Sequence, residues 1–282
     1  MSNNDWMIES SNEAADREPV ELHPERPHPA RVYDYLLGGN TNFASDRAFA
    51  EAALKLNEGT RTTARSNREF LRRAVTFLTR DAGIRQFIDI GTGLPTSPNV
   101  HEIAHSIAPE SRVVYTDNDP IVAAHARALL TSEPGTGPTT YIEADLRKPE
   151  TILSQAHEIL DFTQPIGLLL IAVTHHLKND EDPQAVVAAV VDALPSGSYL
   201  ALSQITDEFR PEQWHAIEAD FARRGSVLTP RPRASIEQFF TGLEKVDPGL
   251  QVVNRWRPEE SDAYKDLSEG ECSLLGAVAR KA

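Results

Sequence analysis

The chain has 282 residues, a formal net charge of −14 and a single cysteine, Cys272. This length is enough to bury one substantial core with appended elements. The acidic charge repels polyanions, so we expect neither a nucleic-acid partner nor a membrane partner. A lone cysteine excludes an intramolecular disulfide framework and a zinc site built from cysteines, which is typical of a reducing cytoplasm.

Residues 1–26 are polar and acidic and have no hydrophobic periodicity. Such a composition cannot bury enough apolar surface to fold, and we expect a disordered tail. The stretch lacks the basic start and apolar segment of a signal peptide. The longest apolar run of the chain, residues 166–173, is too short to cross a membrane. We therefore expect a cytoplasmic protein.

Residues 27–82 have helical periodicity and predict an N-terminal helical cap. A short helix ends at Gly38–Gly39, a second runs around residues 46–56, and a third carries Phe70, Ala74, Phe77 and Leu78 on one face. The glycine pair would let this block move as a lid over a ligand. Packing of an added helix against a sheet explains its apolar residues equally well. Asp46, on this cap, is expected to contribute little to ligand binding.

The third helix of the cap also carries a regular stripe of arginines. Arg61, Arg65, Arg68 and Arg72 follow one another at helical spacing. Such a stripe would suit a carboxylate or phosphate on a substrate. A solvated helix face produces the same pattern, and both interpretations stay open.

Residues 83–282 predict a doubly wound, Rossmann-like α/β domain. Short apolar runs at 85–90, 112–117, 139–145, 165–173 and 198–205 alternate with helical patterns. Three of these helices are expected to begin at Ser97–Pro98, Asp119–Pro120 and Asp182–Pro183. Apolar runs without alternation indicate strands covered on both faces, and therefore a mainly parallel sheet. Closing segments at 251–257 and 272–280 bring the expected sheet to seven strands.

Each of the first three predicted strands carries an aspartate at or next to its carboxyl end. Asp89, Asp117 and Asp145 are separated by equal steps along the chain. Their spacing matches one strand–helix–strand unit of about 30 residues. Because ligands of open α/β sheets bind outside the carboxyl ends of the strands, one ligand is expected to lie across all three ends.

The loop after the first strand discriminates between possible ligands. Gly91 and Gly93 permit a tight turn, but the third glycine of a dinucleotide motif is missing at Thr96. Asp89 would repel a pyrophosphate and attract the ammonium and sulfonium charges of S-adenosylmethionine. Asp117 can accept hydrogen bonds from ribose hydroxyls and Asp145 from the adenine amine. S-adenosylmethionine is therefore the predicted cofactor, although aspartates at these places also serve as helix caps and turn formers.

This arrangement resembles the class I S-adenosylmethionine-dependent methyltransferases. Residues 28–47, 64–75, 87–96 and 113–120 are similar to an actinobacterial methyltransferase family formerly catalogued as a domain of unknown function. The resemblance implies methyl transfer to an unidentified small-molecule acceptor. It also implies a cofactor site lined by Gly91, Gly93, Asp117 and Asp145, with Asn118 and Leu146 beside the adenosine. Pro95 is a departure, since many members of the class have a third glycine there.

Three residues are candidates for the chemistry. His175 and His176 follow the fourth strand, and either imidazole could take a proton from a hydroxyl acceptor or serve a purely structural role. Tyr35 lies in the helical block that would form a lid. The Asn-Pro-Pro-Tyr type of signature found in many nucleic-acid methyltransferases is absent, so DNA is not the expected substrate.

Other classes of function compete with this interpretation. The segment from His101 to His105 matches the H-E-x-x-H pattern of zinc hydrolases, but no third ligand follows at suitable spacing, and we expect no metal. A non-catalytic, S-adenosylmethionine-binding regulator would need the same cofactor site and no catalytic residue. A nicotinamide-dependent oxidoreductase would use the same fold. The sequence indicates no particular oligomeric state.

Overall fold

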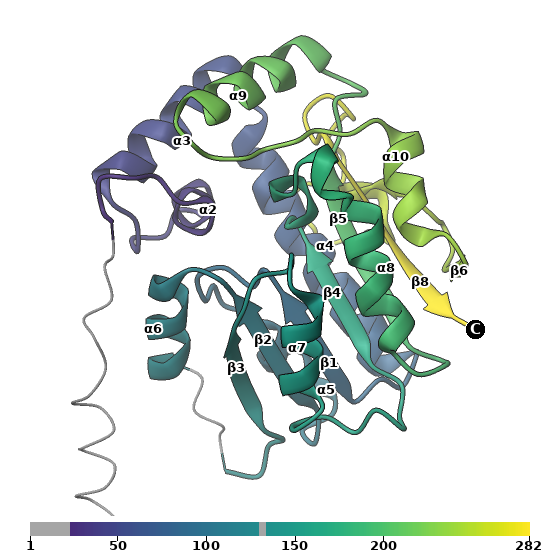
Figure 1. Ribbon diagram of the computed structural model, residues 1–282. Coiled ribbons are helices and arrows are strands. Elements are labelled where there is room, and N and C mark those ends of the chain that lie inside the picture. Colours follow the sequence, from purple (N-terminus) through teal and green to yellow (C-terminus); the bar gives the residue numbers. More distant parts are fainter. Residues whose placement is uncertain (1–22, 130–133) are drawn as a thin grey trace, which may run out of the picture.

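The computed structural model describes residues 23–129 and 134–282 (Figure 1). Most of the expected disordered tail, residues 1–22, lies outside the described residues. Within the described part, no helix is both long and apolar enough to cross a membrane. The strands are β1 (Gln86–Ile90), β2 (Arg112–Asp117), β3 (Thr139–Glu143), β4 (Gly167–Ile171), β5 (Tyr199–Ile205), β6 (Leu243–Lys245), β7 (Gln251–Val252) and β8 (Leu274–Lys281).

The strands form one mixed sheet. Its order is β3-β2-β1-β4-β5-β8-β6, and the short β7 pairs with β8 beside this path. Strands β1 to β5 pair in parallel, whereas β8 runs antiparallel to β5. Because the order reverses between β1 and β4, the carboxyl ends of these two strands form a topological switch point, where such folds bind ligands.

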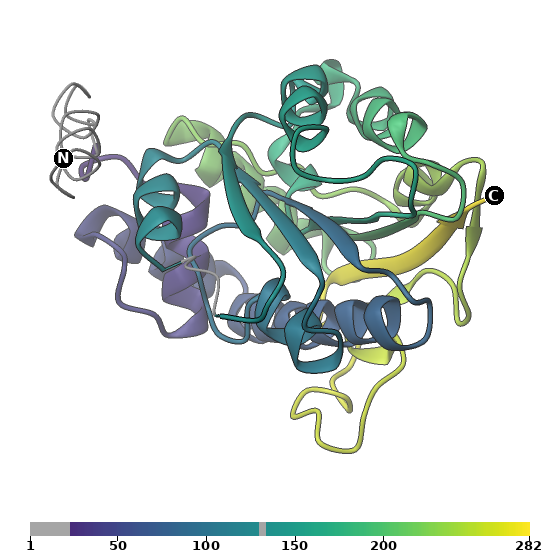
Figure 2. The ribbon, with the colours of Figure 1, turned by 90° about the horizontal axis from the view of Figure 1, so that it is seen from below.

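Helices cover both faces of the sheet, as expected for a doubly wound fold. Helices α4 and α5 lie along one face, and α7 and α8 lie along the other (Figure 2). The N-terminal helices are α2 (Pro29–Leu37), α3 (Ala44–Leu56) and α4 (Thr60–Arg80). The later helices are α5 (Val100–Ile107), α6 (Pro120–Leu129), α7 (Pro149–Ala156), α8 (Pro183–Ala193), α9 (Pro211–Arg223) and α10 (Arg233–Glu237).

Two details differ from the sequence-based expectation. The sheet has eight strands instead of the expected seven, because it also contains β6. Strand β6 has only three residues, which is too few to show an alternating pattern in the sequence. The expected strand at 251–257 is also shorter than predicted, with two paired residues in β7. Helix α5 begins at Val100 instead of Pro98. Its cap is Asn99, whose backbone N–H is bound by the Glu102 side chain in a capping box.

The helices expected to form a cap share one buried core with the sheet. Phe70 and Ala74 of α4 are fully buried, and they belong to the same cluster as Val32 of α2 and Phe49 of α3. Helix α9 joins this group through Phe221, whose ring centroid lies 4.2 Å from that of Phe49. Helices α2, α3 and α9 therefore form a roof above the carboxyl ends of the parallel strands (Figure 1).

Candidate functional site

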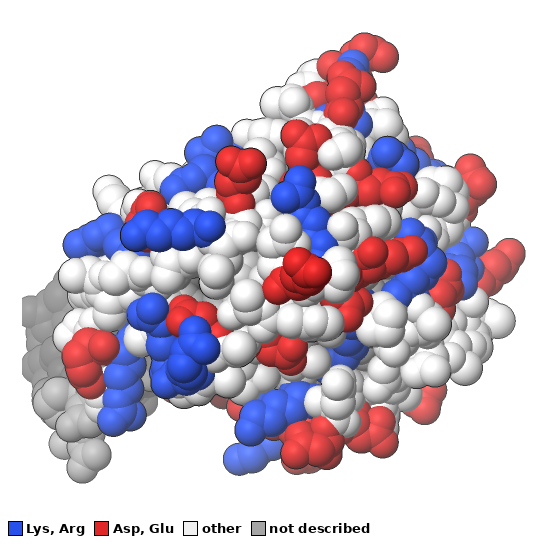
Figure 3. All heavy atoms as spheres, turned by 90° about the horizontal axis from the view of Figure 1, so that it is seen from above, with Lys and Arg blue, Asp and Glu red and all other residues white. Residues whose placement is uncertain are grey.

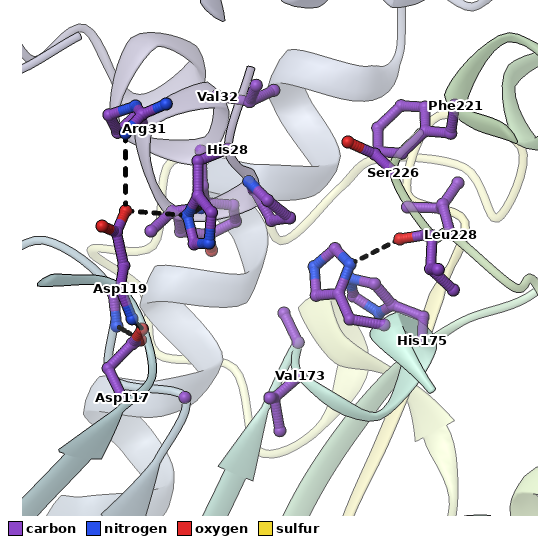
Figure 4. A pocket seen from close by; sticks show the side chains of 18 of the residues that line it. His28, Arg31, Val32, Asp117, Asp119, Val173, His175, Phe221, Ser226 and Leu228 are labelled. Carbon is purple, nitrogen blue, oxygen red and sulfur yellow. Dashed lines mark hydrogen bonds and ion pairs between the residues drawn. The ribbon is translucent and has the colours of Figure 1, made fainter. Parts of the chain in front are cut away.

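A cavity of about 810 Å³ lies between the roof and the carboxyl ends of β1 to β5. Its size falls in the range of small-molecule and cofactor sites. Figure 4 shows Asp117 and Asp119 on one side, and Phe221, Leu228 and His175 on the opposite side. The cavity thus has a polar end at the strand termini of β1, β2 and β3 and a second end below α9.

The loop after β1 closes tightly because of its glycines. Gly91 and Gly93 have φ values of 75° and 66°, in the left-handed region that glycine tolerates best. A Cβ atom on Gly91 would lie 2.3 Å from Cγ2 of Val173, whereas one on Gly93 would meet nothing within 4 Å. Gly91 is therefore required for the contact between the loops that follow β1 and β4.

Asp89 lies buried at the end of β1, and it lines the cavity. Burial raises the pKa of its carboxyl group to about 6, against the opposing effects of a 2.9 Å hydrogen bond from Thr92 and the charge of Arg68. A buried carboxylate favours a cationic partner, since a nearby positive charge repays part of its desolvation.

Asp117, at the end of β2, binds the glycine loop, and its neighbour Asn118 contacts Asp145 after β3. Asp117 accepts hydrogen bonds from the backbone N–H groups of Gly93, at 2.8 Å, and of Asp119, at 2.9 Å. Burial raises the pKa of Asp117, although these two hydrogen bonds oppose the shift. Asn118 donates to Asp145 at 3.3 Å. The three predicted strand ends are therefore brought together, and Leu146 lines the cavity beside them.

Sequence reasoning missed an ion-pair cluster that ties the roof to this end of the cavity. His28 Nδ1 lies 2.8 Å from Asp119 Oδ2 and 3.3 Å from the Ala30 N–H. The shorter contact, to a buried carboxylate, places the proton on Nδ1 and makes His28 the donor. Arg31 lies 3.8 Å from Asp119 (Figure 4). Arg31 also pairs with Asp46 at 3.0 Å.

This cluster gives Asp46 a structural role, and the expectation that it contributes little to ligand binding stays a prediction. Its side chain is fully buried and accepts hydrogen bonds from Arg31 Nε and from the backbone N–H groups of His28 and Phe43. The sequence hides this role because its partner Arg31 comes from another helix. Burial acts to raise the pKa of Asp119, but His28 and Arg31 outweigh it and hold that pKa below its usual value.

The arginine stripe of α4 is divided among different contacts. Arg61 binds backbone carbonyls of α2, Arg65 lies 3.4 Å from the Tyr264 hydroxyl, and Arg72 pairs with Glu259 and Asp262. Of these four arginines, only Arg68 lines the cavity. It donates to the carbonyls of Thr96 and Pro98 and has no carboxylate partner within residues 23–129 and 134–282.

The two histidines after β4 line the cavity, whereas Tyr35 does not. The Tyr35 hydroxyl instead donates to Glu51 at 2.6 Å on the exposed surface. His176 Nδ1 lies 2.8 Å from the Val227 carbonyl, so Nδ1 carries the proton and Nε2 keeps its lone pair. Burial lowers the pKa of His176 to about 4 and that of His175 well below its ordinary value.

The residues of the H-E-x-x-H match each have a structural contact. His101 Nδ1 lies 2.8 Å from the Tyr115 hydroxyl, and His105 Nε2 lies 2.8 Å from the Ser111 carbonyl. Glu102 forms the capping box of α5. Across the described ranges, no group of three or more His, Cys, Asp or Glu side chains is placed to hold a metal ion.

The fold and the cavity define a Rossmann-like, nucleotide-binding class of protein. Comparison with known proteins narrows this class. The family model of S-adenosyl methyltransferases matches residues 15–282. A DUF574 family protein from Streptomyces avermitilis is 43% identical, with 93% of this chain and 100% of that chain covered and a TM-score of 0.89. A proposed methyltransferase from Thermobifida fusca is 40% identical, with 92% and 97% covered and a TM-score of 0.85.

The chain therefore belongs to the S-adenosyl methyltransferase family. No curated protein matches its sequence significantly. The structure of the plantazolicin methyltransferase BamL, which contains S-adenosylhomocysteine, is 10% identical with 90% of this chain and 96% of that chain covered, and its TM-score of 0.51 shows a shared fold.

The protein is an S-adenosylmethionine-dependent methyltransferase, and S-adenosylmethionine is its cofactor. The predicted class of enzyme and the predicted cofactor are thus confirmed. This assignment replaces the nicotinamide-dependent, zinc-hydrolase and non-catalytic alternatives.

Proposed function

We propose that the methyl donor binds across the carboxyl ends of β1, β2 and β3, and that the acceptor is a small molecule enclosed below α9. The observation that carries this proposal is that Asp89, Asp117 and Asp145 line one cavity together with the glycine loop. Carboxylates at successive strand ends suit a ligand with two cationic groups and several hydroxyl and amine donors.

Each residue at the strand ends has a role in this proposal. Asp117 has lone pairs beyond those used by its two backbone donors, and it accepts from the ribose hydroxyls. Asp145 accepts from the adenine amine, with Asn118 and Leu146 beside the adenosine. Asp89 faces the ammonium group, because its buried carboxylate favours a cation. The backbone of Gly91 and Gly93 forms the floor on which the methionine moiety lies.

Arg68 completes the cofactor site. The methionine moiety carries a carboxylate as well as an ammonium group, and Arg68 is a cavity-lining cation without a carboxylate partner among the described residues. Its charge acts on Asp89, and both groups line the same cavity. A cation and a carboxylate in one site are complementary to an amino-acid zwitterion.

His176 is the residue that receives the acceptor's proton. When bound, the cofactor supplies a methyl group activated by the sulfonium, so a carbon–sulfur bond breaks as the bond to the acceptor oxygen forms. The hydrogen bond from His176 Nδ1 to Val227 fixes the tautomer and leaves Nε2 to take the hydroxyl proton. Because its pKa is about 4, His176 stays neutral at physiological pH. The main contribution of the protein is to position the reactants and exclude water.

The charge pattern of the roof favours a small acceptor over a nucleic acid. Figure 3 shows this face, on which Lys and Arg side chains alternate with Asp and Glu side chains instead of forming a broad basic area. A nucleic acid would require a continuous positive surface along its backbone.

Calorimetric titration with S-adenosylhomocysteine, with NAD as a control, tests the proposed cofactor site. We expect micromolar binding of the sulfur compound, no binding of NAD, and loss of affinity in Arg68→Gln. If Arg68→Gln and the wild type bind S-adenosylhomocysteine equally well, the carboxylate assignment is wrong. If neither ligand binds, the whole site assignment is wrong.

A further inference from the structure

The end of the cavity below α9 has walls of a different character from the strand ends. Six side chains that line it come from α2, α3, β5, α9 and the loop after α9, and each is at most 7% exposed: Leu36, Ala53, Ile205, Ile217, Phe221 and Leu228. We call these six residues the apolar end. Because they converge from five separate elements, they enclose a ligand instead of offering it a flat surface.

The charged side chain that lines the apolar end is paired, and the buried guanidinium of Arg231 near His175 donates to the carbonyls of Thr174 and Leu177. Among the Asp, Glu, Lys and Arg side chains that the structure describes around the cavity, only Arg224 belongs to this end. Its guanidinium pairs with Asp220 at 2.9 Å and lies 5.3 Å from the centroid of the Phe49 ring. A charged group bound among these walls would lose its hydration without gaining an opposite charge, which is strongly unfavourable.

Two buried nitrogen atoms at this end lack hydrogen-bond partners. Trp214 Nε1 and His175 Nδ1 have none within the described residues, although their side chains are only 2% and 5% exposed and both line the cavity. An unsatisfied buried polar group of this kind is unfavourable. A neutral oxygen on a ligand would satisfy such a nitrogen without bringing a charge into the apolar end.

From these observations we infer that the methyl acceptor is an uncharged, largely apolar small molecule that carries a hydroxyl group. Its hydrocarbon or aromatic body fills the apolar end, and its hydroxyl faces His176 Nε2, next to the loop after β4. The inference rests on the proposed function, because it assumes that the cofactor occupies the strand ends of the same cavity. It goes further by naming the chemical class of the acceptor.

Three matched probes test the inference: 2-naphthol, naphthalene-2-carboxylate and 2-naphthylmethylammonium. Each is titrated at pH 7.5 into protein saturated with S-adenosylhomocysteine. We expect measurable binding of 2-naphthol and at least about tenfold weaker binding of both charged probes, because either charge would be buried without a partner. Equal or tighter binding of a charged probe would overturn the inference.

A pair of variants places the binding in the apolar end. Ala53→Leu fills this end from α3, and it should weaken 2-naphthol binding about tenfold while S-adenosylhomocysteine binds as in the wild type. Ala52→Leu is the matched control, because Ala52 is the preceding residue of the same helix and does not line the cavity. Equal effects of the two substitutions on 2-naphthol binding would contradict the assignment.

The two failures are distinguishable. If S-adenosylhomocysteine binds but 2-naphthol does not, or if a charged probe is preferred, the acceptor class is wrong and the proposed cofactor site stands. If S-adenosylhomocysteine itself does not bind, the proposed function fails first.

Discussion

The floor and the roof of the cavity differ in how their residues are brought together. The floor consists of strand ends and the loops that follow them, so its acidic residues recur at regular steps along the sequence. The roof consists of the consecutive helices α2 and α3 and of α9, which lies far from them in the chain and meets them only in the folded protein. In our proposal the floor binds the cofactor, whereas the roof encloses the acceptor.

Among substitutions in the floor, Gly91→Ala should have the largest effect on cofactor binding. Its Cβ would collide with Val173 in a backbone region that L-residues avoid, and we expect more than a 100-fold loss of S-adenosylhomocysteine affinity in calorimetry. A Cβ on Gly93 would meet no neighbouring atom, so Gly93→Ala should suffer only from its left-handed backbone conformation. This strain should reduce the free energy of cofactor binding by only about 1–2 kcal/mol. Similar losses in both variants would contradict the close contact between the two loops.

Substitution of Asp46 should break the anchorage of the roof. Asp46→Ala leaves the Arg31 guanidinium buried without its closest carboxylate. We therefore expect the free energy of unfolding to fall by about 3 kcal/mol. Chemical denaturation followed by circular dichroism measures this change. A stability equal to that of the wild type would show that the ion pair does not hold α2 to α3.

Asp117→Asn sharpens the comparison because it alters only the floor. An amide oxygen is a weaker hydrogen-bond acceptor than a carboxylate, both for the ribose hydroxyls and for the backbone N–H of the glycine loop. The affinity for the cofactor should therefore fall about tenfold to thirtyfold. The exposed Asp192→Asn is the control and should bind as the wild type does. Unchanged affinity in the Asp117 variant would remove it from the cofactor site.

The pH dependence of cofactor binding should be the smallest effect. Asp89 attracts the ammonium group only when ionised, and its pKa is about 6, so affinity should fall about tenfold between pH 7.5 and pH 5. Asp89→Asn should bind weakly at both values. Calorimetry at the two pH values measures the change, and a wild-type affinity independent of pH would argue against this role.

The same carboxyl group should affect stability in the opposite direction. Its pKa in the folded state lies above the ordinary value of 3.8, so the folded protein binds the proton more tightly than the unfolded chain. From this group alone, the protein without cofactor should become more stable as pH falls through about 6 toward 3.8. Comparing denaturation of the wild type and Asp89→Asn isolates that contribution.

The sequence predicted the sheet and the floor because their signals are local. Asp89, Asp117 and Asp145 each follow an apolar run, and parallel strands necessarily bring such ends to one edge. Strand β6 was not predicted, because three residues carry too little periodicity to recognise.

The contacts between elements around the cavity could not be predicted in the same way. In the sequence, Arg68 cannot be distinguished from the other three arginines of the stripe. Only in the folded protein do Arg61, Arg65 and Arg72 bind other groups, while Arg68 lines the cavity. The role of Asp46 depends on Arg31, and the tautomer of His176 depends on Val227, a residue about 50 positions away. Such contacts are set by tertiary packing, which no local pattern encodes.

A crystal structure with S-adenosylhomocysteine would test the central claim most directly. We predict that the ribose hydroxyls lie within about 3 Å of the Asp117 carboxylate and that the sulfur points toward His176 and the apolar end. A cofactor bound outside the carboxyl ends of β1, β2 and β3, or with its sulfur directed away from the apolar end, would contradict the account.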